Sequence, residues 1–406
     1  MSSVFTRAAD WLVRHRDRLP RWANRVFESA AHDPDGFIGR LAARLLGGGQ
    51  TVAPTEVPDA PVRVYIAAAN YAAQGYRWAR ALERADAGIA ARNVELVLPG
   101  GFDFPADTRV PIAVVTASEE WAEAEWTAAK LFTHVLVEAQ RPVFGKRFDR
   151  DIRREIQALE EAGVSVAYLC HGTDVRDPDH HAQLTPWSPY PEDPRTEDLR
   201  REAKAGIALL SELRRPTFVS TPDLIADVPW AEWCPVVIDP EVFENDSAPF
   251  ERGPVRIVHS ASIPVQKGTH YVEPALAPLV ASGRVDYRAL TGTPWAEMPG
   301  VYANSDIVLD QFRIGSYGVA ACEAMAAGRV VVGHVMPIVR ERVMRDFGVE
   351  LPIVEANADT LREVVEGLIE DPDRARRIAA AGPEFVRRVH TGAASARALI
   401  EGWIRA

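Results

Sequence analysis

The residue types that could perform chemistry are concentrated in residues 313–328, which read RIGSYGVAACEAMAAG. Gly315, Ser316 and Gly318 stand where a helix should begin, so unpaired backbone N–H groups and the helix dipole could face an anion such as phosphate. Glu323 shares a helical face with Ser316 among small or apolar neighbours. A buried carboxylate needs a partner, and paired ribose hydroxyls would provide one, with the phosphates roughly 10 Å away at about 1.5 Å per residue. These residues predict a nucleotide site; the alternative is a glutamate that points to water.

The residues on either side extend this pattern. Residues 306–311 read DIVLDQ, residues 315–318 read GSYG, and residues 323–328 read EAMAAG before a run of valines. This order resembles the donor-nucleotide region of the GT-B glycosyltransferases of family 4. The resemblance implies that Glu323 holds the ribose. That family usually has another glutamate eight positions earlier, near the donor sugar, but Gly315 occupies that position here, so the sugar-contacting role is not carried over.

A second strand-helix pattern begins near residue 254 and carries candidate phosphate-binding residues. Lys267 is one of only four lysines, and a compact ammonium just ahead of a predicted helix suits a phosphate, with chance placement as the alternative. The resemblance implies that Lys267 and Gly268 hold the donor diphosphate. The arginine that the family places several positions earlier is missing, and His259 is the only candidate substitute. By the same resemblance, Thr291 begins a loop beside the nucleobase.

The first half of the chain contributes the motif HGTDVR at residues 171–176, directly after a predicted strand. Ligands of open α/β sheets bind at such strand ends. The resemblance implies that His171 faces the donor sugar; the alternative is a hydrogen-bonded loop histidine. Asp174 and Arg176 either shape the site or pair with each other. Residues 177–193 are rich in proline and polar groups and should form a loop, which could act as a lid or bind the acceptor.

These candidates fall into three groups. The predicted catalytic residues are His171 and Lys267. The residues predicted to bind the donor nucleotide or sugar are Glu323, Ser316, Tyr317, Gly318, Gly315, Thr291 and His259, and those for the acceptor or a lid are Asp174 and Arg176. No metal site is predicted, because the histidines and aspartates of residues 177–181 match no compact ligand set. No cofactor is expected besides the nucleotide-diphosphate sugar as donor substrate.

Alternating strands and helices must position these residues. Strands are predicted at residues 62–66, 94–98, 112–115, 134–137, 164–169, 217–220, 255–258, 285–290 and 330–332. Helices are predicted at residues 76–84, 119–131, 152–162, 197–213, 360–369, 372–381 and 395–404. Such alternation is typical of parallel, doubly wound sheets. The first strand-helix turn lacks a G-x-G-x-x-G run, so the pattern does not indicate a dehydrogenase.

Composition narrows the class of protein. A length of 406 residues suits two domains, and 47% hydrophobic with 25% charged residues is ordinary for globular chains. The net charge of −11 and the absence of a basic, aromatic-rich stretch argue against a nucleic-acid partner. Three isolated cysteines favour a reducing cytoplasm. No apolar run approaches about 18 residues, so we expect neither a membrane span nor secretion.

The first 50 residues have a different character. They are predicted to form two helices, and the first carries an apolar stripe beside several arginines. Such a basic amphipathic helix could lie on an anionic membrane surface, which predicts a peripheral membrane contact through residues 1–30. The alternative is a helix packed on the body of the protein. The proline-containing residues 51–61 are expected to be a linker.

The resemblance covers residues 62–405 and implies a fold of class α/β, namely GT-B: two facing doubly wound Rossmann-like domains with an N-terminal helical extension. The expected boundaries are 1–60 for the extension and linker, 61–250 for an acceptor-side domain, 251–390 for a donor-nucleotide domain, and 391–406 for a helix that crosses back to the first domain.

The implied function is retaining, metal-independent transfer of a sugar from a nucleotide-activated donor to a hydroxyl acceptor. The acceptor would be a glycan, a lipid-linked acceptor or a small molecule, in each case offering a hydroxyl group. Two alternatives remain: another GT-B enzyme, such as a nucleotide-sugar epimerase or a phosphorylase, and a noncatalytic accessory subunit. Fold alone does not decide among them.

Overall fold

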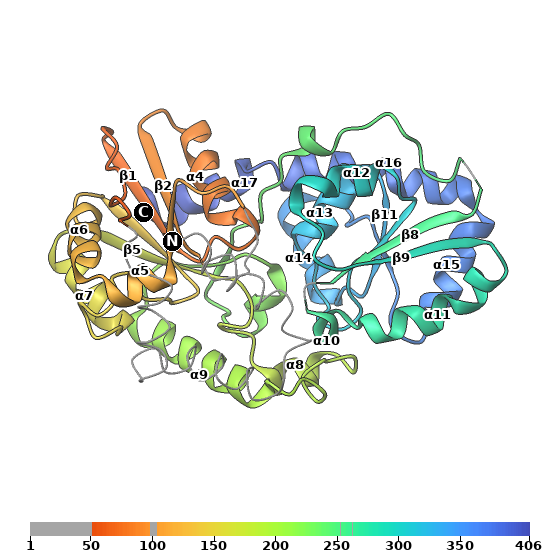
Figure 1. Cartoon of the computed structure of the whole chain (residues 1–406), viewed down its shortest axis with the longest axis horizontal. Coiled ribbons are helices and arrows are strands. Elements are labelled where there is room, and N and C mark those ends of the chain that lie inside the picture. Colours follow the sequence, from red (N-terminus) through yellow and green to blue (C-terminus); the bar gives the residue numbers. More distant parts are fainter. Residues whose placement is uncertain (1–50, 98–103, 252, 262) are drawn as a thin grey trace, which may run out of the picture. The chain divides into compact units, whose positions relative to one another are not determined.

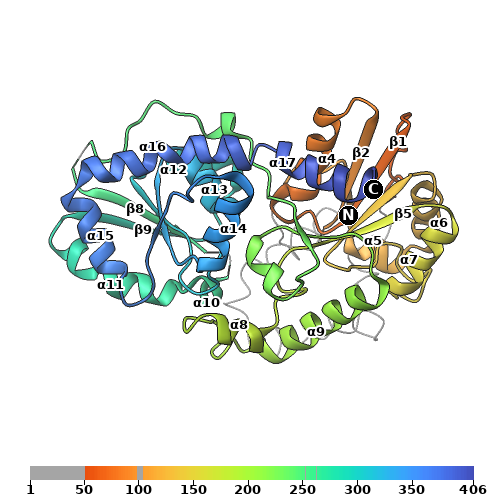
Figure 2. The same cartoon turned by 180° about the vertical axis from the view of Figure 1, so that it is seen from behind.

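The computed structural model describes residues 51–97, 104–251, 253–261 and 263–406. The helices predicted within residues 1–50, and the membrane contact predicted for residues 1–30, lie outside these ranges. The chain divides into two compact units, Met1–Leu169 and Cys170–Ala406, whose elements are labelled in Figures 1 and 2.

Seven strands of the described chain form the first sheet, in the order β3-β2-β1-β4-β5-β6-β7. They are β1 (Val62–Ala68), β2 (Ile89–Val97), β3 (Thr108–Pro111), β4 (His134–Glu138), β5 (Ser165–Cys170), β6 (Thr217–Val219) and β7 (Glu232–Trp233). Strands β1 and β4 pair in parallel, with Val64 opposite His134. Their carboxyl ends therefore lie at one edge of the sheet.

Five described strands form the second sheet, in the order β12-β11-β10-β8-β9, and every pair is parallel. They are β8 (Val255–Ser260), β9 (Val285–Leu290), β10 (Ile307–Leu309), β11 (Val330–Gly333) and β12 (Ile353–Glu355). The central strands β10 and β11 are buried along their whole length, as expected for parallel strands covered on both faces.

Helices connect these strands throughout the described residues. In the first unit they are α4 (Gln74–Ala85), α5 (Ile112–Ala117), α6 (Glu119–Ala129) and α7 (Ile152–Glu161). In the second unit they are α8 (Pro178–Leu184), α9 (Thr196–Leu213), α10 (Pro264–Lys267), α11 (Thr269–Ala281), α12 (Met298–Ala303), α13 (Val319–Ala326), α14 (Pro337–Phe347), α15 (Leu361–Glu370), α16 (Pro372–Val389) and α17 (Ala393–Leu399). The predicted α/β alternation is confirmed.

The second sheet has its own hydrophobic core. Alternate strand residues such as Ile257 and Leu309 pack against Leu276 of α11 and Val365 of α15. Figures 1 and 2 show α11 and α15 on one side of this sheet and α12 and α13 on the other. Because both faces are covered, ligands can reach the sheet only at its strand ends.

The chain end packs near the edge of the first sheet. Helix α17 contacts β7, and the Ser395 hydroxyl donates to the carbonyl of Pro235 at 2.7 Å. A Cβ on Gly402 would lie 2.6 Å from Glu232 Oε2, so the backbone approaches β7 closely there. The short π-helix Ile400–Ile404 follows α17.

Two local predictions were wrong. Residues 112–115 form helix α5 rather than a strand, because Pro111 ends the short strand β3 and begins the helix. A run of four apolar residues fits a buried helix as well as a strand. Residues 177–193 are not entirely loop, since they contain α8. The Asp177 side chain caps α8 by accepting from the backbone N–H of Asp179, with Pro178 in the first turn.

Candidate functional site

The strand order of the second sheet indicates at which edge a ligand would bind. The chain runs from β8 to β9 on one side and then returns to β10 on the other side of β8. The carboxyl ends of β8 and β10 therefore form a topological switch point, where open α/β sheets bind ligands. His259 of β8 lies opposite Leu309 of β10. The segment after β8 carries Lys267, and the segment after β10 leads into α13.

Lys267 lies at the end of α10, between the two strand ends. Its ammonium donates to Asp310 Oδ1 at 3.0 Å and to the carbonyl of Ser260 at 3.2 Å. Its own carbonyl accepts from the backbone N–H of Phe312 at 3.0 Å. An ammonium has three N–H donors, so one remains beyond these two bonds. Lys267 therefore links the segments that follow β8 and β10.

His259 points into the protein and is buried. Its Nδ1 lies 2.9 Å from the carbonyl of Leu309, so it carries the proton, and its Nε2 accepts from the Thr269 hydroxyl at 2.9 Å. Burial lowers the pKa of His259, which is therefore neutral near pH 7. This arrangement gives no positive charge to replace the missing phosphate-binding arginine.

The Gln311 side chain organises the loop between β10 and α13. Its Oε1 accepts from the backbone N–H groups of Arg313, Ile314 and Gly315 at 3.2, 2.7 and 3.3 Å. Its Nε2 donates to the carbonyl of Ser316, and to that of His334 at 2.9 Å. One buried amide thus fixes the whole approach to α13.

The structure explains the glycine at position 315. Its φ is +74°, a conformation that favours glycine, and an added Cβ would lie 2.5 Å from Met336 Cγ. The Gly315 carbonyl also accepts from the backbone N–H of Met336 at 2.8 Å. A glutamate at this position would be strained and crowded, so the loop here is built for glycine.

Helix α13 begins at Val319, with Gly318 as an extended N-cap residue, so Ser316 lies before the helix and not on a helical face with Glu323 as predicted. The buried Ser316 hydroxyl lies beside Asp223 but makes no hydrogen bond of normal geometry to any described residue. The Tyr317 hydroxyl lies 3.2 Å from His390 Nε2 in the interior. Only the backbone of Tyr317 can therefore face a ligand at the start of the helix.

Glu323 lies inside α13 and is 3% exposed, as the small and apolar neighbours predicted. Its Oε1 accepts a hydrogen bond of 2.8 Å from the indole N–H of Trp295, which follows β9. The buried Tyr302 hydroxyl also lies beside this carboxylate. Thr291 stands at the exposed start of the same β9 loop. The carboxylate therefore has partners within the protein, contributed by segments far apart in sequence.

The HGTDVR motif follows β5 as a tight turn. Asp174 Oδ1 accepts from the backbone N–H groups of His171 and Gly172 at 3.0 and 2.7 Å, which fixes the backbone of the histidine. Arg176 Nη2 forms a buried ion pair with Asp223 at 2.6 Å. Burial opposes the charge on Asp223, but Arg176 outweighs this effect and the pKa of the carboxyl lies below its usual range. Asp174 therefore shapes the turn, and the ion-pair partner of Arg176 is Asp223.

The segment around α8 is joined to the loop after β10. His181 Nε2 donates to the carbonyl of Ile314 at 2.9 Å, and burial lowers the pKa of His181 to about 4. Arg313 is also buried and binds Glu192 Oε2 at 2.7 Å and the carbonyl of Ser188 at 2.9 Å. These contacts brace the loop that Gln311 organises.

Comparison with solved structures decides the fold. Sucrose-phosphate synthase from Thermosynechococcus elongatus has 12% identity and a TM-score of 0.55, and the match covers 84% of this chain and 98% of that one. A glycosyltransferase from Rickettsia africae has 9% identity and a TM-score of 0.52, over 85% and 98%. HepE from Anabaena, solved with UDP and glucose, has 10% identity and a TM-score of 0.51, over 84% and 98%. The fold is GT-B.

Sequence comparison is narrower. Residues 272–401 match the family model described as glycosyl transferase-like. This range includes α13 with Glu323 and the loop with Trp295, but Lys267 and His171 lie outside it. No curated protein matches the chain. The similarity to glycosyltransferases therefore rests on the GT-B fold and on this C-terminal match.

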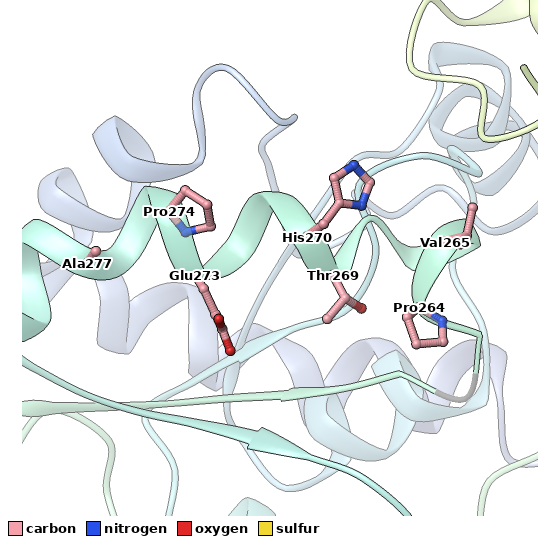
Figure 3. Close-up of a pocket in the computed structure, with 7 residues that line it drawn as sticks. All are labelled: Pro264, Val265, Thr269, His270, Glu273, Pro274 and Ala277. Atoms are coloured by element: carbon pink, nitrogen blue, oxygen red, sulfur yellow. The ribbon is translucent and has the colours of Figure 1, made fainter. Parts of the chain in front are cut away.

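A separate hollow of about 680 Å³ lies along α10 and α11 (Figure 3). Its lining is largely apolar and consists of Pro264, Val265, Thr269, His270, Glu273, Pro274 and Ala277. None of the predicted donor residues lines this hollow.

Within the described residues, no cluster of three or more His, Cys, Asp or Glu side chains could hold a metal ion. No helix in the same ranges is long and apolar enough to cross a membrane.

Sequence reasoning missed two residues of this candidate site. Gln311 is part of the DIVLDQ run but received no role, although an amide just beyond a predicted buried strand must find hydrogen-bond partners in the loop that follows. Trp295 carried no local signal, because its contact with Glu323 spans 28 positions.

Proposed function

We propose that this protein is a retaining glycosyltransferase that moves a sugar from a nucleotide-diphosphate donor to a hydroxyl acceptor. The main supporting observation is the buried Glu323 on the helix that follows the switch point of the second sheet. A carboxylate at that place suits the paired hydroxyls of a ribose. One protein of similar fold, HepE, has been solved with UDP-glucose, which supports a donor of this class.

The proposed roles follow from the charges that develop when the anomeric bond breaks. Negative charge forms on the departing diphosphate and positive charge on the sugar. The remaining N–H of Lys267 and the backbone N–H groups at the start of α13 would bind the diphosphate, while Glu323 holds the ribose. His171, fixed through Asp174, would orient the sugar. No metal ion and no additional cofactor take part in this scheme.

The deciding experiment is incubation of the protein with a panel of nucleotide sugars. Release of nucleoside diphosphate that depends on an added glycan or lipid extract is expected for a transferase. Conversion of the donor without an acceptor would instead indicate an epimerase, and turnover that requires inorganic phosphate a phosphorylase. If the protein binds nucleotides but transforms no donor under any of these conditions, the transferase proposal is wrong and an accessory role is favoured.

A further inference from the structure

Trp295 is one of the residues that hold the Glu323 carboxylate. It lies in the short 3₁₀-helix Trp295–Glu297, and its indole N–H donates to Glu323 Oε1 at 2.8 Å. Glu323 is buried, whereas Trp295 is partly exposed in a loop whose neighbours Pro294 and Ala296 are exposed. The contact therefore lies between the protein interior and the surface beside the β9 loop.

The surroundings of Trp295 restrict its ring. Phe243 packs edge-on against it, with ring centroids 6.5 Å apart. Tyr302, which lies on α12, is 1% exposed. Burial and the nearby carboxylate raise the pKa of Tyr302 well above its usual value, so its hydroxyl stays protonated and can donate. Two neutral donors thus surround one charged acceptor.

The chemistry of its indole suits Trp295 to positioning the Glu323 carboxylate. An indole N–H can only donate, so it fixes a carboxylate without accepting any hydrogen from a ribose hydroxyl. A carboxylate has about four acceptor sites, more than the two that the indole N–H and the Tyr302 hydroxyl take. Since hydrogen bonds to an ionised acceptor are short and directional, this bond sets the plane in which the carboxylate meets a ligand.

We propose that Trp295 is a positioning residue that makes the site selective for ribonucleotides over 2′-deoxyribonucleotides. Its N–H orients Glu323 so that the carboxylate accepts from both hydroxyls of the ribose. A 2′-deoxyribose offers one hydroxyl fewer and gains less from this orientation. The inference rests on the proposed function, because it requires Glu323 to bind the ribose of the donor.

The test is calorimetric titration of three matched pairs: UDP, GDP and ADP, each beside its 2′-deoxy form. The parent should bind the ribo form of its nucleotide about tenfold more tightly than the deoxy form, as expected for the loss of a hydrogen bond to a charged group. Trp295→Phe should reduce this ratio to about 1 to 3 by weakening the ribo form, while the affinity for the deoxy form stays nearly the same.

Trp233→Phe is the matched control. Trp233 is another tryptophan of the second unit, buried where Trp295 is partly exposed, and its N–H donates to the carbonyl of Ser220 at 3.3 Å, remote in sequence from Glu323. This variant also loses one indole N–H but should keep the parental ratio of ribo to deoxy affinity. If Trp295→Phe does not fold, benzothienylalanine at position 295 keeps the ring shape without the N–H and should give the result expected for phenylalanine.

The outcomes separate the inference from the proposed function. If Glu323→Gln weakens the ribo form while removal of the Trp295 N–H leaves the ratio unchanged, the inference is wrong and the proposed function stands. Equal weakening of ribo and deoxy forms would show a merely structural tryptophan and would also overturn it. If the parent binds no nucleoside diphosphate, or Glu323→Gln has no effect on binding, the ribose assignment fails and the inference fails with it.

Discussion

Gly315 shows how one residue constrains the candidate site. Gly315→Ala should lower the free energy of unfolding by about 2 to 4 kcal/mol, because it adds left-handed strain and a clash with Met336. Gly300→Ala is the control: apart from its chain neighbours and its own helix backbone, no atom lies within 4 Å of its added Cβ, and helical alanine should stabilise by up to about 1 kcal/mol. Chemical denaturation measures both. Equal stability of Gly315→Ala and the parent would contradict this account of the loop.

Glu323 and His171 separate binding from chemistry at the residue scale. Glu323→Gln should weaken nucleoside diphosphate binding by about 1.5 to 3 kcal/mol, since a charged hydrogen bond is lost in ground and transition states alike. His171→Ala should lower turnover but leave that affinity nearly unchanged, because the diphosphate has no sugar to contact. Titration beside turnover measurements tests both. A His171→Ala protein with normal turnover would remove the catalytic assignment.

At the scale of elements, the loop between β10 and α13 depends on a single amide. Gln311→Leu removes the partners of three backbone N–H groups and two carbonyls. We expect a loss of at least about 3 kcal/mol in the free energy of unfolding, together with weaker nucleotide binding. Gln157→Leu changes an exposed glutamine of α7 and should alter stability by less than about 0.5 kcal/mol. Comparable stability of the two variants would argue against an organising role for Gln311.

The buried His390, directly after α16, should make the stability of the protein depend on pH. His390 Nδ1 donates to the carbonyl of Val236 at 2.8 Å, and burial lowers the pKa of His390 to about 4. An unfolded histidine titrates near 6.5, so below that pH the unfolded chain binds a proton that the folded chain excludes. The contribution of His390 to stability should therefore fall by about 3 kcal/mol between pH 6.5 and 4.

The measurement is the free energy of unfolding of the parent and of His390→Asn across this pH range. Burial lowers the pKa of His181 in the same way and raises the pKa of Glu155 to about 7, which acts in the opposite direction. Both groups are present in each protein, so their effects cancel in the difference. Parallel pH profiles for parent and variant would contradict the prediction.

At the scale of the whole molecule, the scheme must balance charge. The chain carries a net charge of −11, and the proposed donor is also an anion. Attraction must then come from local groups, Lys267 and the start of α13, instead of the overall field. We expect full transfer activity after treatment with a chelator, measured as nucleoside diphosphate release. Activity that is lost with the chelator and restored by manganese would overturn the metal-independent proposal.

The sequence by itself determined the repeating units of this protein. Apolar runs such as residues 330–332 indicated buried strands, and the alternation of strands and helices indicated parallel sheets. The small and apolar neighbours of Glu323 also predicted its burial correctly. These properties follow from local periodicity, which a linear sequence displays directly. Residues 112–115 form an apolar run too short to distinguish helical from strand periodicity, and the strand predicted there was wrong.

The tertiary structure decided which distant groups meet. Trp295 binds Glu323 across 28 positions, Arg176 binds Asp223 across 47, and Arg313 binds Glu192 across 121. The Arg176 contact follows from the order of the strands, since β5 and β6 are neighbours and the loops at their carboxyl ends come together. Arg313 and Glu192, in contrast, follow strands of different sheets, so their contact depends on how those segments pack. The conformation of Gly315 likewise depends on Met336, which arrives from the segment after β11. Residue types gave the chemistry, and the packing of remote segments determined which side chain each group contacts.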